Sequence, residues 1–225
     1  MIGEIHAAFP QEQTIWFQRN SFRERKKTFA KLDAVNPVIG AITDAFQQND
    51  VLEAIAAVTQ VNGLEADPEL YAGGISLMSK ADFLNPHIDN SHDAHRTRYR
   101  RLNLLYYVSP DWCAEYGGNF ELWDDKVERP KLIVSKYNRL LVMETNRASW
   151  HSVNPVRVDK NRCCVSNYYF SKNSPESRDY YHVTSFLGRP GQTVRRFVGR
   201  IDNFVRQSIA VTFEMSRGKS LSRSR

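Results

Sequence analysis

The stretch GISLMSKADFLNPHID, residues 74–89, is where the chain changes from a helix-like to a strand-like pattern. From this point, short runs of strand-forming residues are separated by turn residues. We expect eight strands, in Ile75–Lys80, Pro86–Asp89, Arg101–Val108, Asn119–Trp123, Leu132–Ser135, Arg139–Glu144, Trp150–Val153 and Arg162–Phe170. Short strands preceded by helices predict a β-sandwich or barrel that is braced by helices on one side.

The first third of the chain is predicted to be helical. Asn36-Pro37 provides an N-cap with proline at the first helical position. Asp50 followed by Glu53 is a capping-box variant that opens a second helix, and Gly63 lies just beyond its end. We therefore expect one structural domain with four parts: a helical support (1–73), a β-rich catalytic core (74–170), a C-terminal extension with a helix (171–215) and a disordered basic tail (216–225).

The expected C-terminal helix carries an apolar stripe. Its apolar residues recur at helical spacing, at Val194, Phe197, Val198, Ile201, Phe204, Val205 and Ile209. Such a stripe packs on the barrel or on a partner subunit, so the sequence is compatible with a homodimer through this helix.

The net charge of +6 is concentrated at the C-terminal end. Residues 189–225 hold nine Lys/Arg and two acidic residues, a net +7, so the preceding 188 residues sum to −1. The basic charge therefore lies outside the segment that carries the chemistry. A solvated or disordered end is the favoured interpretation, and binding to RNA or to an anionic surface is the alternative. Nucleic acid is not expected as a partner.

Cysteine usage and hydropathy indicate a cytoplasmic protein. The three cysteines, Cys113, Cys163 and Cys164, show no C-x-x-C spacing, and a disulfide between the adjacent pair would be strained. No apolar run reaches the roughly 20 residues that span a bilayer, and no secretory signal is evident. We expect no membrane partner.

The sequence His87-Ile88-Asp89 is the centre of the functional argument. Residues i and i+2 of a strand project from the same face, so His87 and Asp89 can reach one metal ion. His151, in a strand-like run late in the chain, is the best candidate for a third ligand. Two imidazoles and one carboxylate on one face of an octahedron suit Fe(II) and leave three coordination positions open.

A candidate for binding an anionic co-substrate lies 11 residues after His151. Arg162 begins a β-rich run, where its guanidinium can bind a carboxylate through two hydrogen bonds. Arg157 is the alternative, but it falls in the expected turn after Asn154-Pro155. Because alternate residues of a strand share a face, this β-rich run has one face made of Arg162, Cys164, Ser166 and Tyr168. An earlier strand has a corresponding face made of Asn103, Leu105 and Tyr107. Tyr107 can donate its hydroxyl to the same carboxylate.

These segments together resemble the 2-oxoglutarate/Fe(II) oxygenases of the prolyl 4-hydroxylase type. The resemblance covers about residues 75–170 and rests on His87-x-Asp89, Leu104-Leu-Tyr-Tyr-Val108 with Asp111-Trp112, Gly117-Gly118, and His151-Ser-Val-x-Pro155 with Arg162. It implies a mainly β, α+β fold, the double-stranded β-helix (a jelly-roll or cupin-like barrel), with His87, Asp89 and His151 as iron ligands. It also implies that Arg162 pairs with the distal carboxylate of 2-oxoglutarate and that Tyr107 hydrogen-bonds to it.

The resemblance implies a hydroxylase that uses Fe(II), 2-oxoglutarate and O₂ and releases succinate and CO₂. Ascorbate is a further candidate cofactor. The substrate would be proline-like, an amino acid, a peptide or another small metabolite. Asp89 favours hydroxylation over halogenation, because related halogenases carry a small residue in its place. Many relatives have a tyrosine on the strand before the metal pair, where this chain has Leu77, Met78 and Ser79.

An alternative interpretation is a cupin-like metal-binding or sensory barrel without oxygenase turnover. A structural metal site needs neither open coordination positions nor a carboxylate clamp. The complete set of ligands together with Arg162 therefore argues against this alternative.

The segment after Asp89 is rich in charge and has several interpretations. His92 and His95, at i and i+3, have a spacing that suits zinc, but no further ligand stands nearby, so a solvated loop or a substrate-contacting lid is favoured. The arginines at 96, 98, 100 and 101 indicate either a solvated strand edge or an anionic substrate. We expect substrate contacts from Arg98, Asn103 and Tyr168.

Overall fold

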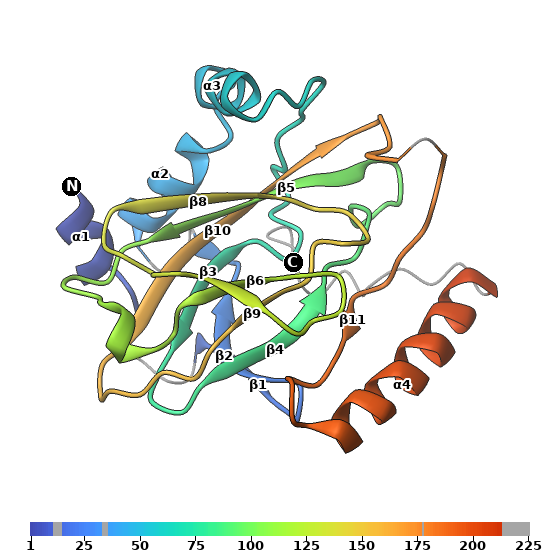
Figure 1. The fold of residues 1–225 in the computed structure, drawn as a ribbon. Helices are drawn as coiled ribbons and strands as arrows, with labels where there is room; N and C mark the ends of the chain where they lie inside the picture. The colour runs from blue at the N-terminus through green and yellow to red at the C-terminus, as the bar shows by residue number, and fades with distance from the viewer. Residues whose placement is uncertain (11–14, 33–35, 177, 213–225) are drawn as a thin grey trace.

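The computed structural model describes residues 1–10, 15–32, 36–176 and 178–212 (Figure 1). The helices are α1 (Ile2–Ala7), α2 (Pro37–Ala45), α3 (Asn49–Thr59) and α4 (Thr193–Thr212), and a short 3-10 helix spans Ala114–Tyr116. The strands are β1 (Phe17–Asn20), β2 (Glu24–Phe29), β3 (Gly74–Met78), β4 (Phe83–Ile88), β5 (Tyr99–Tyr107), β6 (Phe120–Trp123), β7 (Pro130–Ile133), β8 (Arg139–Glu144), β9 (His151–Val153), β10 (Arg162–Ser171) and β11 (Ser185–Phe186).

The strands form one antiparallel sheet that curls into a double-stranded β-helix. Their order is β7-β6-β9-β4-β2-β3-β10-β5-β8, with β1 paired to β2 and β11 paired to β4. Each of the eight strands expected from the sequence is present, so the predicted fold class is confirmed. In Figure 1, α1 to α3 lie on one flank of the sheet and α4 lies at the opposite edge, beside β11.

The flank under α1 to α3 is the main hydrophobic core. Ile5 and Ile39 from the helices pack against Ile75 of β3 and Val165 of β10 in one buried cluster. A second cluster joins α2 and α3 to β5 and β10, and it includes Tyr169. Alternate residues of β10 therefore face the helices, which leaves the intervening residues free to line the interior of the barrel.

The helix starts were predicted with mixed success. The Asn36 side chain accepts a hydrogen bond from the amide of Val38 at 2.9 Å, as the cap prediction requires. The capping box at Asp50 was wrong, because α3 already begins at Asn49 and Gln48 occupies its cap position. Asp50 instead accepts a bond from the amide of the next residue.

A β-hairpin interrupts the segment that was expected to be helical. Strands β1 and β2 lie within residues 1–73, and β2 fits between β3 and β4 in the sheet. This position matters for function, because β4 carries the candidate metal ligands. The predicted disordered tail, residues 216–225, lies outside the described residues.

Candidate active site

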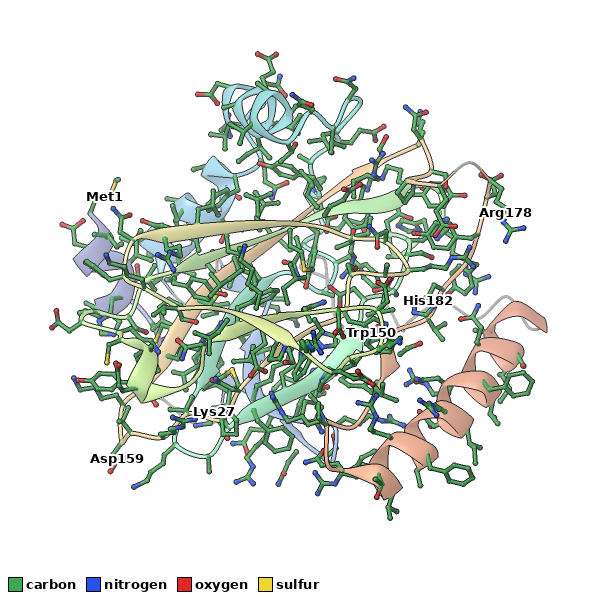
Figure 2. All side chains as sticks on the ribbon, in the orientation of Figure 1. Met1, Lys27, Trp150, Asp159, Arg178 and His182 are labelled. Carbon is green, nitrogen blue, oxygen red and sulfur yellow. The ribbon has the colours of Figure 1, made fainter. Side chains whose placement is uncertain are left out.

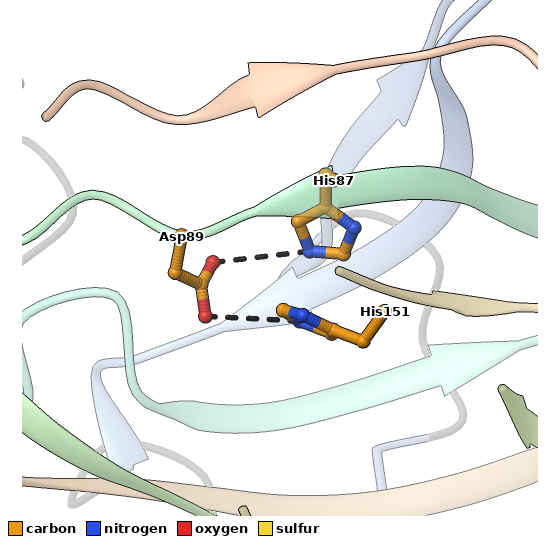
Figure 3. Close-up of side chains that lie close together, drawn as sticks. All are labelled: His87, Asp89 and His151. Atoms are coloured by element: carbon orange, nitrogen blue, oxygen red, sulfur yellow. Dashed lines mark ion pairs between the residues drawn. The ribbon is translucent and has the colours of Figure 1, made fainter. Parts of the chain in front are cut away.

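Three side chains from two neighbouring strands converge inside the barrel (Figure 3). His87 lies near the end of β4, Asp89 follows that strand, and His151 begins β9. The pairing of β4 with β9 sets His87 opposite His151, and their ring centroids are 4.0 Å apart. The Nε2 atoms of the two histidines lie 3.8 Å from Asp89 Oδ1 and Oδ2, respectively. One ligand atom from each residue lies within 4.8 Å of the others, a geometry in which all three reach one ion.

Both histidines are oriented by backbone carbonyls. Nδ1 of His87 lies 3.0 Å from the Asn85 carbonyl, and Nδ1 of His151 lies 2.9 Å from the Ser149 carbonyl. A proton on Nδ1 leaves the Nε2 lone pair facing the centre, as a metal ligand requires. Burial lowers the pKa of His87 to about 3, with a further contribution from His151, and burial also lowers the pKa of His151. Both rings are therefore neutral at physiological pH.

A buried arginine accompanies the carboxylate ligand. Nη1 of Arg100 lies 3.4 Å from Asp89 Oδ2, and the guanidinium lies over the Tyr168 ring at 3.9 Å. Burial alone would raise the pKa of Asp89, but the Arg100 guanidinium holds that pKa well below its usual range. The side chain of Arg100 is only 1% exposed, and its Nε and Nη2 have no hydrogen-bond partner in the structure.

The interior of the barrel forms a cavity that runs from these ligands to Arg162. Its wall includes residues of β3, β5 and β10, namely Ile75, Ser76, Met78, Asn103, Leu105, Arg162, Cys164, Ser166 and Tyr168. Both period-two faces expected from the sequence are thus turned inward, although Tyr107 itself does not line the cavity. Arg162 is 3% exposed, and its Nε donates to Ser135 Oγ at 3.2 Å.

The aromatic ring of Tyr107 lies next to the guanidinium of Arg162. The guanidinium of Arg162 lies 4.8 Å from the centroid of the Tyr107 ring. Burial raises the pKa of Tyr107 to about 12, so its hydroxyl stays protonated and can donate. This hydroxyl has no hydrogen-bond partner in the structure. Of Leu77, Met78 and Ser79 on the strand before the metal pair, Met78 lines the cavity, and its sulfur accepts weakly from Arg162 at 3.6 Å.

These residues fit Fe(II) and 2-oxoglutarate. Two neutral imidazoles and one ionised carboxylate form the donor set of the non-haem iron facial triad. Asp89 Oδ2 has no hydrogen-bond donor, as expected of an oxygen that is available to a cation. At the other end of the cavity, the guanidinium of Arg162 suits a carboxylate.

A second, outer cavity reaches the ligands from the surface. It is lined by His87, Asp89, Arg100, Tyr168 and Phe186 at its inner end, and its outer lining includes residues of the β1–β2 hairpin and the segment after it, namely Phe17, Arg19, Glu24, Lys26, Thr28 and Lys31. The four basic side chains of this lining outnumber the two carboxylates. Tyr168, like His87 and Asp89, lines both cavities.

Two predicted features lie apart from the site. Arg98 was expected to contact substrate, but it lines neither cavity; its Nε donates to Asp93 at 2.8 Å and its Nη1 lies 3.4 Å from Glu65. His92 bonds to Ser91 and His95 to Glu69. Within the described ranges, the one group of three metal-binding side chains is His87, Asp89 and His151, so the alternative zinc cluster is absent there.

Comparison with known proteins agrees with this geometry. Residues 73–170 match the family model of the 2OG-Fe(II) oxygenase superfamily. This segment, somewhat under half of the chain, is therefore similar to members of that superfamily. Over 88 residues, 36% of the chain, it is 27% identical to mouse prolyl 3-hydroxylase OGFOD1. That segment is only 16% of the mouse protein, so the chain spans a small part of this relative.

Solved structures share the fold at low sequence identity. A Pseudomonas putida prolyl-4-hydroxylase superposes with a TM-score of 0.52 at 13% identity, covering 77% of this chain and 86% of the other. Streptomyces hygroscopicus HygX, solved with nickel and 2-oxoglutarate bound, gives a TM-score of 0.50 at 18% identity, covering 80% and 83%. The cofactors of the superfamily are Fe(II) and 2-oxoglutarate, and no helix in the described part of this chain is long and apolar enough to cross a membrane.

Proposed function

We propose that the protein is a 2-oxoglutarate-dependent Fe(II) hydroxylase in which His87, Asp89 and His151 hold the iron. Arg162 binds the distal carboxylate of 2-oxoglutarate, and the Tyr107 hydroxyl donates a hydrogen bond to it. The observation that carries the proposal is the placement of three converging ligand atoms at one end of a buried cavity and of a buried arginine at its other end.

The proposed reaction converts a substrate C–H group to C–OH. One oxygen atom of O₂ enters the new hydroxyl group and the other enters succinate, while 2-oxoglutarate loses CO₂. Bound Fe(II) supplies the redox chemistry. The ligand set carries a formal charge of −1, so the iron site keeps a net +1 that attracts the anionic co-substrate. Arg162 is 3% exposed, and this burial strengthens its pairing with a carboxylate.

Anaerobic titration of the metal-free protein with Fe(II) and 2-oxoglutarate tests this proposal. Fe(II) and 2-oxoglutarate held together at these residues would give a weak visible charge-transfer band. We expect the band in the native protein, its loss in His87→Ala, and its retention in His95→Ala, because His95 is exposed and lines neither cavity. A folded, iron-loaded native protein without the band would instead favour a metal-binding barrel without turnover.

The substrate is proposed to carry a carboxylate. The outer cavity contributes Arg19, Lys26, Lys31 and Arg100 against Glu24 and Asp89, a net +2. Fe(II) adds two positive charges and 2-oxoglutarate removes two, so the cavity stays at +2 in the loaded enzyme. A basic, partly enclosed cleft raises the local concentration of anions. A proline-containing peptide with an acidic side chain, or an acidic small molecule, fits this charge.

Matched pairs of compounds test the charge preference. Succinate release is measured with short proline peptides that carry either glutamate or glutamine, and with the corresponding capped amino acids. We expect only the acidic members to stimulate release. Lys31→Gln should raise the KM for an acidic substrate about fivefold at low salt and leave uncoupled 2-oxoglutarate turnover unchanged.

Arg98→Gln is the matched control for Lys31→Gln, because it removes the same charge from a residue that lines neither cavity. Its KM should stay at the native value. Equal stimulation by the acid and the amide, or equal effects of the two variants, would rule out recognition of a carboxylate by this cavity.

A further inference from the structure

Helix α4 binds the rest of the protein through its polar face. The Asn203 amide exchanges two hydrogen bonds with the backbone of Phe186 in β11, at 2.9 and 2.8 Å. One turn later, the Gln207 amide bonds the backbone of the segment before β11, at 3.0 and 2.6 Å. Gly199 permits this close approach, since a Cβ there would lie 2.9 Å from the Phe186 carbonyl oxygen. Polar groups thus fix which side of the helix faces the body.

The apolar side of α4 therefore points away from the body. The stripe predicted from the sequence is exposed along its whole length, from 44% at Ile209 to 75% at Phe204. At 100° per residue, its members lie within an arc of about 140°. Side chains along α4 extend outward from the ribbon in Figure 2. Of the two predicted surfaces for this stripe, the barrel is excluded, whereas a partner subunit stays a prediction.

The β1–β2 hairpin beside α4 also exposes apolar side chains next to arginines. Phe17 and Phe22 are 56% and 49% exposed, and the guanidinium groups of Arg19 and Arg23 lie over their rings at 5.3 and 5.0 Å. Phe22 shares a surface pocket with Arg195 and Gly199 of α4. Among the described residues, every phenylalanine that is exposed lies on this hairpin or on α4. The two elements form one apolar surface, which we call the α4–hairpin face.

The charge around this face is positive. Helix α4 holds four arginines and one aspartate, and Arg195 and Arg200 flank the apolar arc on its two sides. The sequence after the described residues continues with Arg217, Lys219, Arg223 and Arg225 against a single glutamate. An occupant of this face must accept large apolar side chains at its centre and basic side chains at its edges.

We propose that the α4–hairpin face docks on an anionic lipid surface. An amphipathic helix with basic flanks lies in the plane of the bilayer interface, with its apolar side buried about 5–10 Å deep. Its arginines then reach the lipid phosphates. The outer cavity is lined by Phe17 and Arg19 of the same hairpin, so docking would bring the cavity entrance close to the lipid surface.

Two other occupants fit the face less well. A second copy of the chain would bring together two helices that each carry a net +3, and like charges would oppose the pairing. RNA would match the charge but not the aliphatic part of the stripe, because nucleic acid is bound by basic grooves with stacked aromatic residues. Helix α4 instead presents valine and isoleucine on a convex ridge.

Cosedimentation with vesicles tests the proposal on the full chain. The vesicles are phosphatidylcholine alone, or phosphatidylcholine with about one-third phosphatidylserine. We expect binding to the anionic vesicles only, and at least a tenfold lower partition coefficient, by order of magnitude, for the double variant Phe197→Ser/Phe204→Ser. The partition coefficient of the double variant Arg195→Gln/Arg200→Gln should fall about tenfold at low salt.

The matched control is Val58→Ser/Leu132→Ser, which removes two other exposed apolar side chains. Its partition should equal the native value, and all variants should keep the native charge-transfer band with Fe(II) and 2-oxoglutarate. The proposal fails if the native chain does not bind anionic vesicles. A dimer in sedimentation velocity that Phe197→Ser/Phe204→Ser dissociates would then assign the face to a second copy. RNA binding that is lost in the same variant would assign it to nucleic acid.

Discussion

Asp89→Ala is expected to abolish Fe(II) binding and also to destabilise the metal-free protein by about 3 kcal/mol. The first effect follows from loss of the only carboxylate among the three converging ligands. The second arises because Arg100 is almost completely buried and Asp89 faces it at 3.4 Å. Removing one partner of a buried ion pair leaves the other charge without compensation. Urea unfolding in the presence of a chelator measures this loss apart from metal binding.

A double-mutant cycle separates the two roles of Asp89. In Asp89→Ala/Arg100→Met the uncompensated guanidinium is gone, so most of the lost stability should return while Fe(II) binding stays absent in anaerobic calorimetry. Asp89→Asn is the steric control, because it keeps the size of the side chain and removes its charge. If Asp89→Ala were as stable as the native protein, or if the second substitution restored nothing, the 3.4 Å contact would carry no energetic coupling.

The strands of the core could be predicted because their signal is local. On β10, Cys163 and Val165 face the helices while Cys164 and Ser166 face the cavity, and this alternation is visible in the sequence. The β1–β2 hairpin was missed because it lacks that signal. Strand β2 contains only one apolar residue, Phe29, among charged and polar ones. Its place comes from pairing with β3 and β4, which are distant in the sequence.

In the candidate site, too, the placement of side chains relative to one another was predictable only where they are close together in the sequence. His87 and Asp89 are two residues apart, so strand geometry alone brings them together, whereas His151 was a candidate that only the pairing of β4 with β9 places opposite them. Arg98, and not Arg100, was predicted to contact substrate, and alternation along a strand would have put both on one face. The alternation does not apply to Arg98 because β5 begins only at Tyr99, so Arg98 lies in the preceding loop and pairs with Asp93.

The orientation of α4 shows a further limit of sequence patterns. The spacing of its apolar residues predicted the helix and its stripe, and α4 spans the expected residues. An amphipathic pattern normally indicates that the apolar side packs inward. Here Asn203 and Gln207 form side-chain bonds to backbone groups around β11, and these bonds select the opposite side. Such polar docking depends on carbonyl and amide positions that no local pattern encodes.

Arg162→Ala is expected to weaken 2-oxoglutarate binding by about 100-fold, because truncating one partner of a buried, hydrogen-bonded charge pair costs roughly 2–5 kcal/mol. Arg162 is buried at the end of the cavity, and a carboxylate bound there without it would lose its charged partner. Arg162→Lys keeps the charge but not the forked geometry, so we expect an intermediate loss. Tyr107→Phe removes one hydrogen-bond donor to a charged acceptor, which should weaken 2-oxoglutarate binding about tenfold.

The concentration of 2-oxoglutarate that gives half of the charge-transfer band measures these losses, and the KM for 2-oxoglutarate should rise in parallel. Arg157→Ala is the matched control, since Arg157 was the alternative in the sequence and is exposed outside both cavities. Fe(II) affinity without co-substrate reports on the fold and should stay native in all four variants. A native half-saturation in Arg162→Ala, with the loss appearing in Arg157→Ala instead, would move the carboxylate site out of the barrel. A loss confined to Arg162 and Tyr107 would place it between β5 and β10, where the pairing of Tyr107 with Cys164 makes Tyr107 and Arg162 neighbours on adjacent strands.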